Sequence, residues 1–371
     1  MTHAKKDEPI KLLVVVGARP NFIKAAAFLR AVGAYNHVRG EKHIDTVLLH
    51  TGQHYDHAMS QAIFMELNIP QPDYNLGIGR TANANHVGKT MDALHRVYLD
   101  EAPDWVVVFG DTSSTLAAAL TARMLGVRLC HIEAGLRCGD MTMPEEVNRV
   151  LTDTVADLLL APTAQAAENL HSDRDATGRV KHVGNIMIDA MDYYAEHLRE
   201  PQRTDHYCLL TLHRASNVDV PHTLSNLVYA IKNTARANLD VQFLWPMHPR
   251  TEKQLARNGY SFRDCPNIII LPPASYLGML GLLKYAKVIT DSGGLQAEST
   301  VAGVPCLTVR DTIEWTETLT ENGGTAVLAK GSNLQRLFGE AITKPRKPYR
   351  PLLWDGCAAD RCVLAIVEYT T

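Results

Sequence analysis

The stretch HIEAGLRCGDMTMPEEVNR (His131–Arg149) decides the fold that we predict for this chain. It follows an apolar run and includes Glu133 and Glu145. Upstream, GDTSST adds Asp111 directly after the apolar run Trp105–Phe109. A solvated charged segment would explain the charges, but not their position where apolar strands stop at Gly or Pro turns. Because open α/β sheets bind ligands at the carboxyl ends of their strands, the pattern predicts a strand-end carboxylate cluster and an enzyme.

Length and composition set the broad class. A chain of 371 residues is long enough for two domains, and 21% charged with 46% hydrophobic residues is typical of a globular protein. The formal net charge of −3 gives no general attraction to nucleic acid or to an anionic membrane. The polar start Met1–Pro9 does not resemble a signal peptide, and apolar runs such as Leu12–Val16 are too short to span a membrane. We therefore expect a cytoplasmic protein.

The cysteines and histidines predict no metal site. Seven scattered cysteines without a CxxC pair argue against a disulfide framework or zinc site, so we expect reduced and mostly buried thiols. His50, His54 and His57 lie close in sequence, but they lack further ligands at zinc-binding spacing.

Alternating strands and helices predict two Rossmann-like domains. In the first half, the expected strands are Leu12–Val16, Thr46–His50, Trp105–Phe109, Val127–Ile132 and Leu158–Ala161. In the second half, they are Tyr207–Leu212, Gln242–Pro246, Ile268–Leu271, Lys287–Thr290 and Pro305–Arg310. Short connections favour parallel sheets with helices on both faces, and two such halves imply a cleft between them.

The expected domain boundaries follow from this alternation. The segment His182–Met191 is predicted to be the last strand and turn of the first domain, and Glu200–His206 a polar connection. We therefore expect an N-terminal domain over residues 1–183 and a C-terminal domain over residues 184–356. After a Pro/Lys/Arg-rich crossover, a terminal helix within residues 357–371 is expected to pack back on the first domain. The segment Pro70–Gly88 is expected to be a loop.

Two strand–helix junctions have the features of anion sites. Arg19 and Lys24 flank a helix that starts directly after the first strand, where free N–H groups and the helix dipole attract anions, although a solvated Arg and Lys would look the same. In DSGGLQAE, residues Ser292, Gly293 and Gly294 expose backbone N–H groups at a helix start, which suits a phosphate. One turn later, Glu298 can accept hydrogen bonds from a ribose diol.

Several side chains have a structural alternative. Arg137 either orients a ligand or pairs with Glu133 or Glu145. Asp291 is expected to cap the following helix. One of Glu145 and Glu146 is expected only to compensate the dipole of its helix. The two residues His248 and Arg250 either face the ligand or cap a loop.

Nine motifs in order resemble the non-hydrolysing UDP-N-acetylglucosamine 2-epimerase family. They are GARPNFIKAA, TGQHYD, GDTSSTLA, HIEAGLR, MPEEVNR, TLHR, MHPRT, TDSGGLQAE and RDTIEW. The resemblance implies a GT-B-like fold, usually a homodimer, and interconversion of UDP-GlcNAc and UDP-ManNAc without a redox cofactor or metal. The mechanism that it implies eliminates UDP to leave 2-acetamidoglucal, and then adds UDP back with C2 protonated from the other face. Closure of the cleft is expected to exclude water.

The resemblance also implies roles for the residues already named. Asp111, Glu133 and Glu145 are the expected acid/base carboxylates with His213 nearby, without a division of roles among them. The diphosphate is expected at Arg19, His213 and the N–H groups of residues 292–294, the ribose at Glu298, and the sugar near Lys24.

Some positions depart from the family pattern and leave the substrate open. Ser216 stands where Glu is usual, Met279 where some members have an aromatic residue, and Trp315 where some have Arg. The short loop Gly139–Met143 resembles the subgroup that acts on modified sugars such as UDP-2,3-diacetamido-glucuronate. The same sequence also allows a hydrolysing relative, a GT-B glycosyltransferase or a non-enzymatic sugar-nucleotide sensor. The TGQHYD sequence departs from the form associated with activation by UDP-GlcNAc.

Overall fold

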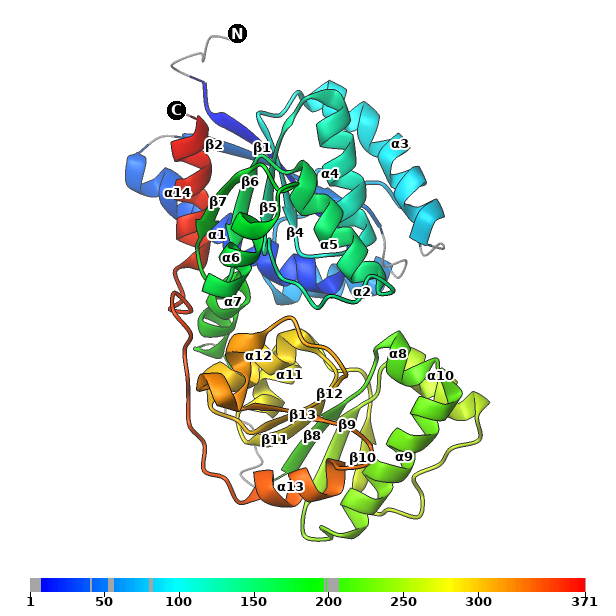
Figure 1. Ribbon diagram of the computed structural model, residues 1–371. Helices are drawn as coiled ribbons and strands as arrows, with labels where there is room; N and C mark the ends of the chain where they lie inside the picture. The colour runs from blue at the N-terminus through cyan, green and yellow to red at the C-terminus, as the bar shows by residue number, and fades with distance from the viewer. Residues whose placement is uncertain are drawn as a thin grey trace. The chain divides into compact units, whose positions relative to one another are not determined.

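The computed structural model describes residues 8–40, 42–52, 57–79, 83–196, 198 and 207–370. The chain divides into two compact units, one formed by Met1–Asp192 with Leu352–Thr371 and the other by Tyr193–Pro351. Within the described residues, each unit holds one parallel sheet, of seven strands in the first and six in the second (Figure 1). The two-domain α/β class predicted from the alternating pattern is confirmed.

The first sheet has the strand order β3-β2-β1-β4-β5-β6-β7. Its strands are β1 (Ile10–Val16), β2 (Ile44–His50), β3 (Tyr74–Asn75), β4 (Trp105–Phe109), β5 (Arg128–Ile132), β6 (Leu158–Ala161) and β7 (Arg179–His182). Its helices are α1 (Arg19–Arg39), α2 (His57–Glu66), α3 (Asn83–Glu101), α4 (Ser113–Leu125), α5 (Pro144–Val155), α6 (Ala164–Ser172), α7 (Ile186–Ala195) and α14 (Ala358–Thr370). Every residue of β4 is buried, as expected for an apolar central strand.

Strand register brings the candidate residues of the first unit to one edge. Phe109 at the end of β4 pairs with Ile132 at the end of β5, and the Gly110 amide donates to the Ile132 carbonyl at 3.0 Å. The turns that follow β4 and β5 therefore leave the sheet side by side. They place Asp111 and Glu133 at the same sheet edge.

The second sheet has the strand order β10-β9-β8-β11-β12-β13. Its strands are β8 (Tyr207–Thr211), β9 (Gln242–Pro246), β10 (Ile268–Leu271), β11 (Ala286–Thr290), β12 (Cys306–Val309) and β13 (Ala326–Ala329). Its helices are α8 (Ala215–Val218), α9 (Pro221–Arg236), α10 (Pro249–Arg257), α11 (Tyr276–Leu283), α12 (Gly293–Ala302) and α13 (Leu334–Ile342). Thr290 pairs with both Thr211 and Thr308, so the ends of β8, β11 and β12 also lie in line.

Two predictions of local structure were wrong. The expected strand and turn over His182–Met191 is strand only up to His182, after which α7 begins. The Asn185 side chain accepts the amide of Met187 at 3.0 Å, which starts this helix and extends the first unit to Asp192, beyond the expected boundary at residue 183. The expected loop Pro70–Gly88 contains β3 and the start of α3.

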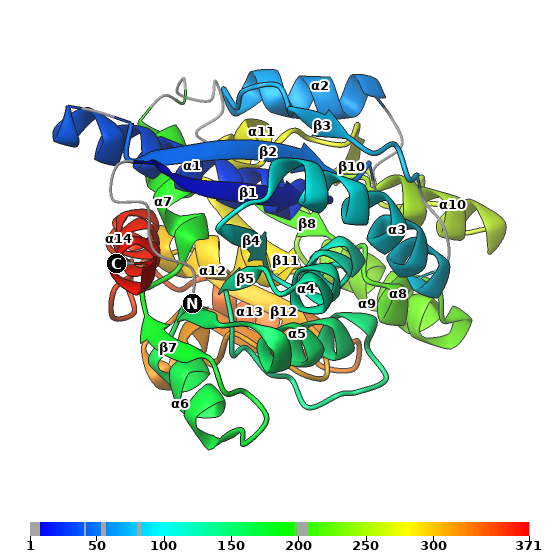
Figure 2. The ribbon, with the colours of Figure 1, turned by 90° about the horizontal axis from the view of Figure 1, so that it is seen from above.

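The C-terminal helix packs within the first unit. α14 lies beside α1 (Figure 2). The Trp105 indole donates to Thr370 Oγ1 at 2.8 Å, and Arg361 donates to the Val183 carbonyl at 2.9 Å. These contacts join the last residues of the chain to β4 and to the segment that follows β7.

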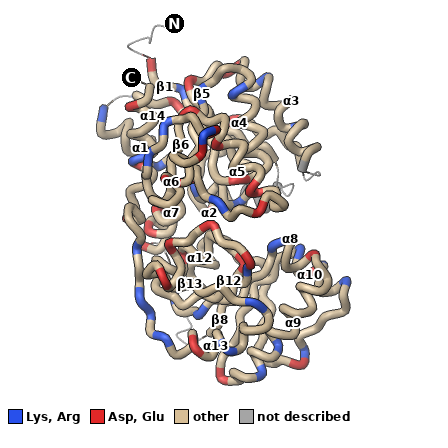
Figure 3. Tube along the Cα trace, viewed as in Figure 1, with Lys and Arg blue, Asp and Glu red and all other residues tan. Residues whose placement is uncertain are grey.

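Charged residues of both signs occur in both units. Lys and Arg are interspersed with Asp and Glu in both units (Figure 3). Among the described residues, no helix is long and apolar enough to cross a membrane. All seven cysteines are free, and Cys130, Cys208, Cys265, Cys306 and Cys362 are buried, which confirms the expectation of mostly buried thiols.

A buried carboxyl group makes the docking of α14 dependent on pH. Asp189 on α7 accepts the Ala359 amide at 2.6 Å, and burial raises the pKa of Asp189 to about 6 from an ordinary 3.8. Because the native state holds this proton more tightly than the unfolded chain, the contribution to stability is complete below pH 3.8 and is lost as the pH rises through about 6.

We therefore expect Asp189→Asn, which cannot ionise but keeps an acceptor for Ala359, to gain stability relative to the native chain as the pH rises. The gain between about pH 4 and pH 7 should reach about 3 kcal/mol, because one pKa unit corresponds to about 1.4 kcal/mol. Urea unfolding of both proteins across this range measures the difference. A difference in unfolding free energy that does not change with pH would contradict the prediction.

Candidate active site

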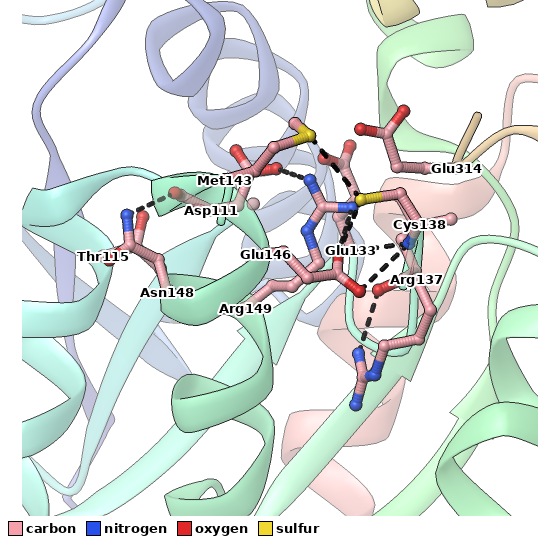
Figure 4. Close-up of polar contacts among 12 residues, drawn as sticks. Asp111, Thr115, Glu133, Arg137, Cys138, Met143, Glu146, Asn148, Arg149 and Glu314 are labelled. Atoms are coloured by element: carbon pink, nitrogen blue, oxygen red, sulfur yellow. Dashed lines mark hydrogen bonds and ion pairs between the residues drawn. The ribbon is translucent and has the colours of Figure 1, made fainter. Parts of the chain in front are cut away.

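Asp111 follows β4 and is held by α5. Arg149 Nη2 forms an ion pair with Asp111 Oδ2, and Asn148 Nδ2 donates to the Asp111 carbonyl at 2.9 Å (Figure 4). Arg149 is almost completely buried, whereas the Asp111 side chain is about one-third exposed. Helix α5 thus fixes a carboxylate that remains accessible to a small molecule.

Glu133 follows β5 and is paired with Lys24. Lys24 Nζ lies 2.6 Å from Glu133 Oε1, and both side chains are nearly buried. Glu133 has φ of 75°, an unusual left-handed conformation for a residue other than glycine. Gly110 has φ of 62°, and a Cβ atom there would lie 3.0 Å from Lys24 Nζ and 3.2 Å from Glu133 Oε1, so both the backbone and the neighbouring pair favour glycine. The structure therefore joins Lys24 to the carboxylate cluster.

His131 connects the two strand ends, and the sequence did not identify it as a site residue. Its Nδ1 lies 2.7 Å from Asp153 Oδ1, and its Nε2 lies 2.8 Å from the Gly110 carbonyl oxygen. The ring therefore links Asp153 on α5 to the turn that follows β4. Burial opposes the ionisation of Asp153, but the charges of His131 and Arg137 outweigh it and hold the pKa of Asp153 below its usual range. One signal was available in the sequence, namely a histidine within an otherwise apolar strand.

The expected partners of Arg137 were wrong. Arg137 Nη1 lies 2.6 Å from Asp153 Oδ2, and its Nη2 lies 3.5 Å from Asp173 Oδ2, so neither Glu133 nor Glu145 is its ion-pair partner. The two acceptors come from α5 and the end of α6, which could not be matched by proximity in sequence. A contact between Arg137 and substrate stays a prediction.

The two acidic residues at the start of α5 have different environments. Glu146 is buried and accepts the amides of Cys138 at 3.1 Å and Gly139 at 2.9 Å. Glu146 Oε2 also lies 3.3 Å from Arg149 Nη1 (Figure 4). Glu145 is exposed in the first turn and has no ion-pair partner among the described residues. Glu146 therefore orders the loop that precedes α5, whereas Glu145 is open to solvent.

The strand–helix turn before α1 is less available to an anion than expected. Asn21 Oδ1 accepts the amides of Ala18 at 3.0 Å and Gly17 at 3.3 Å, so these two N–H groups already have an acceptor. Arg19 is half-buried at the first position of α1. An anion here would depend on the side chains of Arg19 and Lys24.

In the second unit, Asp291 holds His213 instead of capping α12. The buried Asp291 carboxylate accepts the amides of His213 and Arg214 and the side-chain amide of Asn217, at 2.9 to 3.1 Å. It also lies 2.7 Å from His213 Nδ1. Burial opposes its ionisation, but the hydrogen bond and charge of His213 outweigh it and lower the pKa of Asp291. This contact fixes a proton on Nδ1, and the expected capping role is taken by Ser292.

The predicted phosphate site lies at the start of α12. The Ser292 hydroxyl accepts the Leu295 amide at 3.3 Å, and the Ser292 amide donates to Thr290 Oγ1 at 2.9 Å. Gly293 and Gly294 begin the helix, and Glu298 is buried one turn later. This geometry provides the N-terminal helix end that the sequence predicted.

Further predicted residues have structural roles or fall outside the described residues. The His248 side chain accepts the Arg250 amide at 3.1 Å and caps α10, and Arg250 forms an ion pair with Asp219 at 2.7 Å. A contact of either residue with the ligand stays a prediction. Residues 53–56, which include His54, lie outside the described residues, as does the side chain of His57. Within the described residues, no group of three or more His, Cys, Asp or Glu side chains could hold a metal ion.

Comparison with known proteins identifies the family. The family model for UDP-N-acetylglucosamine 2-epimerase matches residues 36–367, so the chain belongs to this family. A UDP-N-acetylglucosamine 2-epimerase of Methanococcus maripaludis is 39% identical over 361 residues, covering 93% of this chain and 95% of the relative. A UDP-2,3-diacetamido-2,3-dideoxy-D-glucuronate 2-epimerase of Pseudomonas aeruginosa is also 39% identical, over 317 residues, covering 84% of this chain and 86% of the relative.

A solved structure agrees with this assignment. The Methanocaldococcus jannaschii UDP-GlcNAc 2-epimerase in complex with UDP-GlcNAc and UDP is 36% identical, with a TM-score of 0.87 over 97% of this chain and 99% of that chain. The chain is therefore an epimerase, which is an isomerase, and its GT-B-like fold is confirmed.

The buried Lys24–Glu133 pair generates a stability prediction. Lys24→Met would leave the Glu133 carboxylate without its cation, which should cost about 3 to 5 kcal/mol of unfolding free energy. The double variant Lys24→Met with Glu133→Gln removes both charges and should recover most of this loss. Urea unfolding of the three proteins measures the coupling. A Lys24→Met variant as stable as the native chain would mean that Glu133 does not depend on Lys24.

Proposed function

We propose that this chain is a non-hydrolysing 2-epimerase that interconverts UDP-GlcNAc and UDP-ManNAc. The observation that carries the proposal is the presence of two cation-paired carboxylates at neighbouring strand ends, Glu133 with Lys24 and Asp111 with Arg149. The names of the M. maripaludis and M. jannaschii relatives support the choice of sugar.

The chemistry needs a base and an acid because C2 is not next to a carbonyl group. A base removes the C2 proton, and the electron pair of the C2–H bond forms the C1=C2 double bond. The bond between C1 and the UDP oxygen breaks at the same time, so UDP leaves and 2-acetamidoglucal remains. In the return step, a UDP oxygen adds to C1 while a proton reaches the opposite face of C2. We assign the two proton transfers to Asp111, Glu133 and Glu145, because a carboxyl group held beside C2 can accept or return a proton.

The remaining contacts hold the nucleotide. We assign the diphosphate to Arg19, His213 and the segment Ser292–Gly294. The Ser292 amide already donates to Thr290 Oγ1, so the donors offered there are the Ser292 hydroxyl and the amides of Gly293 and Gly294. A helix N-terminus and fixed N–H groups stabilise the charge that develops on the leaving diphosphate. The Asp291 contact leaves His213 Nε2 as the ring nitrogen available to a ligand. Glu298 is assigned to the ribose, and Lys24 to the neighbourhood of the sugar.

A second sugar is the main alternative substrate. The P. aeruginosa relative, named for UDP-2,3-diacetamido-2,3-dideoxy-D-glucuronate, has the same identity as the M. maripaludis relative, and the short loop Gly139–Met143 points the same way. The chemistry at C1 and C2 would be unchanged, and only the groups at C3 and C6 would differ.

The expected homodimer and the expected cytoplasmic location stay predictions. Light scattering of the purified protein measures the oligomeric state.

Incubation with UDP-GlcNAc in deuterated water, followed by proton NMR, tests the activity. We expect UDP-ManNAc with deuterium at C2, since the returning proton comes from a group that exchanges with solvent. Glu133→Gln should abolish the exchange, because the amide cannot accept the proton. Glu340→Gln, an exposed carboxylate paired with Arg336, is the matched control and should keep full activity.

The remaining outcomes each select a different function. Free ManNAc with UDP would mean a hydrolysing enzyme. Reaction with UDP-2,3-diacetamido-glucuronate alone would select the second sugar. No exchange with either sugar would contradict the epimerase proposal.

A further inference from the structure

Arg310, the first residue after β12, has one end of its guanidinium group engaged. It is only 7% exposed, and its Nη2 donates to Glu314 Oε1 at 2.6 Å. Its Nη1 is also buried, but has no hydrogen-bond partner among the described residues. A buried donor without an acceptor is unfavourable, and such groups in native proteins usually serve a purpose.

The unengaged end of Arg310 lies beside the start of α12. A Cβ atom built on Gly293 would be 3.6 Å from Arg310 Nη1 and 3.1 Å from the indole ring of Trp315. Gly293 is the first residue of α12, directly after the capping residue Ser292. The donor therefore points to the helix end that favours an anion, and Trp315 covers the same place.

The carboxylates close to this place are already engaged. The Glu314 carboxylate accepts hydrogen bonds from Arg310 at 2.6 Å and from Arg214 at 3.3 Å, so it is shared by two guanidinium groups. Asp291, next to Ser292, is occupied by donors from the segment His213–Asn217. Arg310 Nη1 forms no hydrogen bond with either carboxylate. An external anion at the start of α12 would complete the hydrogen bonds of this donor.

We infer that Arg310 is a further ligand-binding residue, which donates from Nη1 to a phosphate oxygen of a diphosphate bound at the start of α12. Glu314 holds the guanidinium group in place, and the absence of a side chain at Gly293 lets Arg310 Nη1 lie next to the backbone at the start of α12. The inference rests on the proposed function only in taking the diphosphate to be that of a UDP-sugar. The competing explanation is that Arg310 only stabilises Glu314.

Calorimetric binding of UDP, uridine and inorganic pyrophosphate to the full chain distinguishes the two. The test variant is Arg310→Lys, which keeps a cation next to Glu314 but has a single nitrogen, so it lacks the second nitrogen donor that Nη1 provides. The matched control is Arg336→Lys, an exposed arginine of the same unit that is paired with Glu340. We expect Arg310→Lys to weaken UDP and pyrophosphate about 10- to 100-fold, as for loss of a charge-assisted hydrogen bond, with uridine binding unchanged.

The outcomes separate this inference from the proposed function. Unchanged UDP affinity in Arg310→Lys, or an equal loss for UDP and uridine, would overturn the role of Arg310. If the native chain binds pyrophosphate through Arg310 but does not bind UDP, the inference stands and the proposed substrate fails. If the native chain binds neither UDP nor pyrophosphate, both fail.

A second variant covers the case in which Arg310→Lys does not fold. Arg310→Met combined with Glu314→Gln removes both charges of the buried pair and keeps an acceptor for Arg214. It should lose affinity for UDP and pyrophosphate while binding uridine as the native chain does. Retention of native UDP affinity in the double variant would overturn the inference.

Discussion

The close approach of Lys24 to Glu133 is the contact on which the polar cluster of the first unit depends. A buried ion pair adds little net stability, because desolvation of the two charges offsets their attraction. Two apolar side chains in the same places would often give an equally stable fold. The pair also comes with a left-handed backbone at Glu133 and favours a residue without a side chain at Gly110. A pair that adds little net stability under these local constraints is in line with the chemical role proposed for it above.

The neighbouring contacts keep this pair in register. His131 joins the turn after β4 to Asp153 on α5, and the same helix carries Arg149 to Asp111. A shift of α5 would therefore move both strand-end turns. In the second unit, the carboxylate at a strand end has a different role. Asp291, which follows β11, accepts hydrogen bonds from the His213 amide and ring and so orders the turn after β8. One unit thus offers carboxylates, whereas the other offers N–H donors.

The sequence predicted the strands and the turns better than the side-chain partners. The three consecutive valines of WVVVF favour a strand buried on both faces, and Trp105–Phe109 is that strand. The segment after His182 was predicted wrongly because a short apolar run fits a strand and a buried helix equally well. The partners of Arg137 and Asp291 could not be predicted, because residues such as Asp153 and Asn217 reach them only through the tertiary fold. His131 was missed for the same reason, since its importance lies in what its ring contacts.

In the proposed mechanism, the most demanding task is to stabilise the negative charge on the leaving diphosphate, and the carboxylates do not perform it. When the C1–O bond breaks, negative charge collects on the diphosphate, and donors already oriented toward it need no reorganisation at that moment. A guanidinium group fixed at one end by Glu314 and open at the other is such a donor. A flexible surface lysine would have to give up hydration and side-chain entropy first. This difference explains why a buried arginine at the start of α12 suits elimination and re-addition of UDP, whatever groups the sugar carries at C3 and C6.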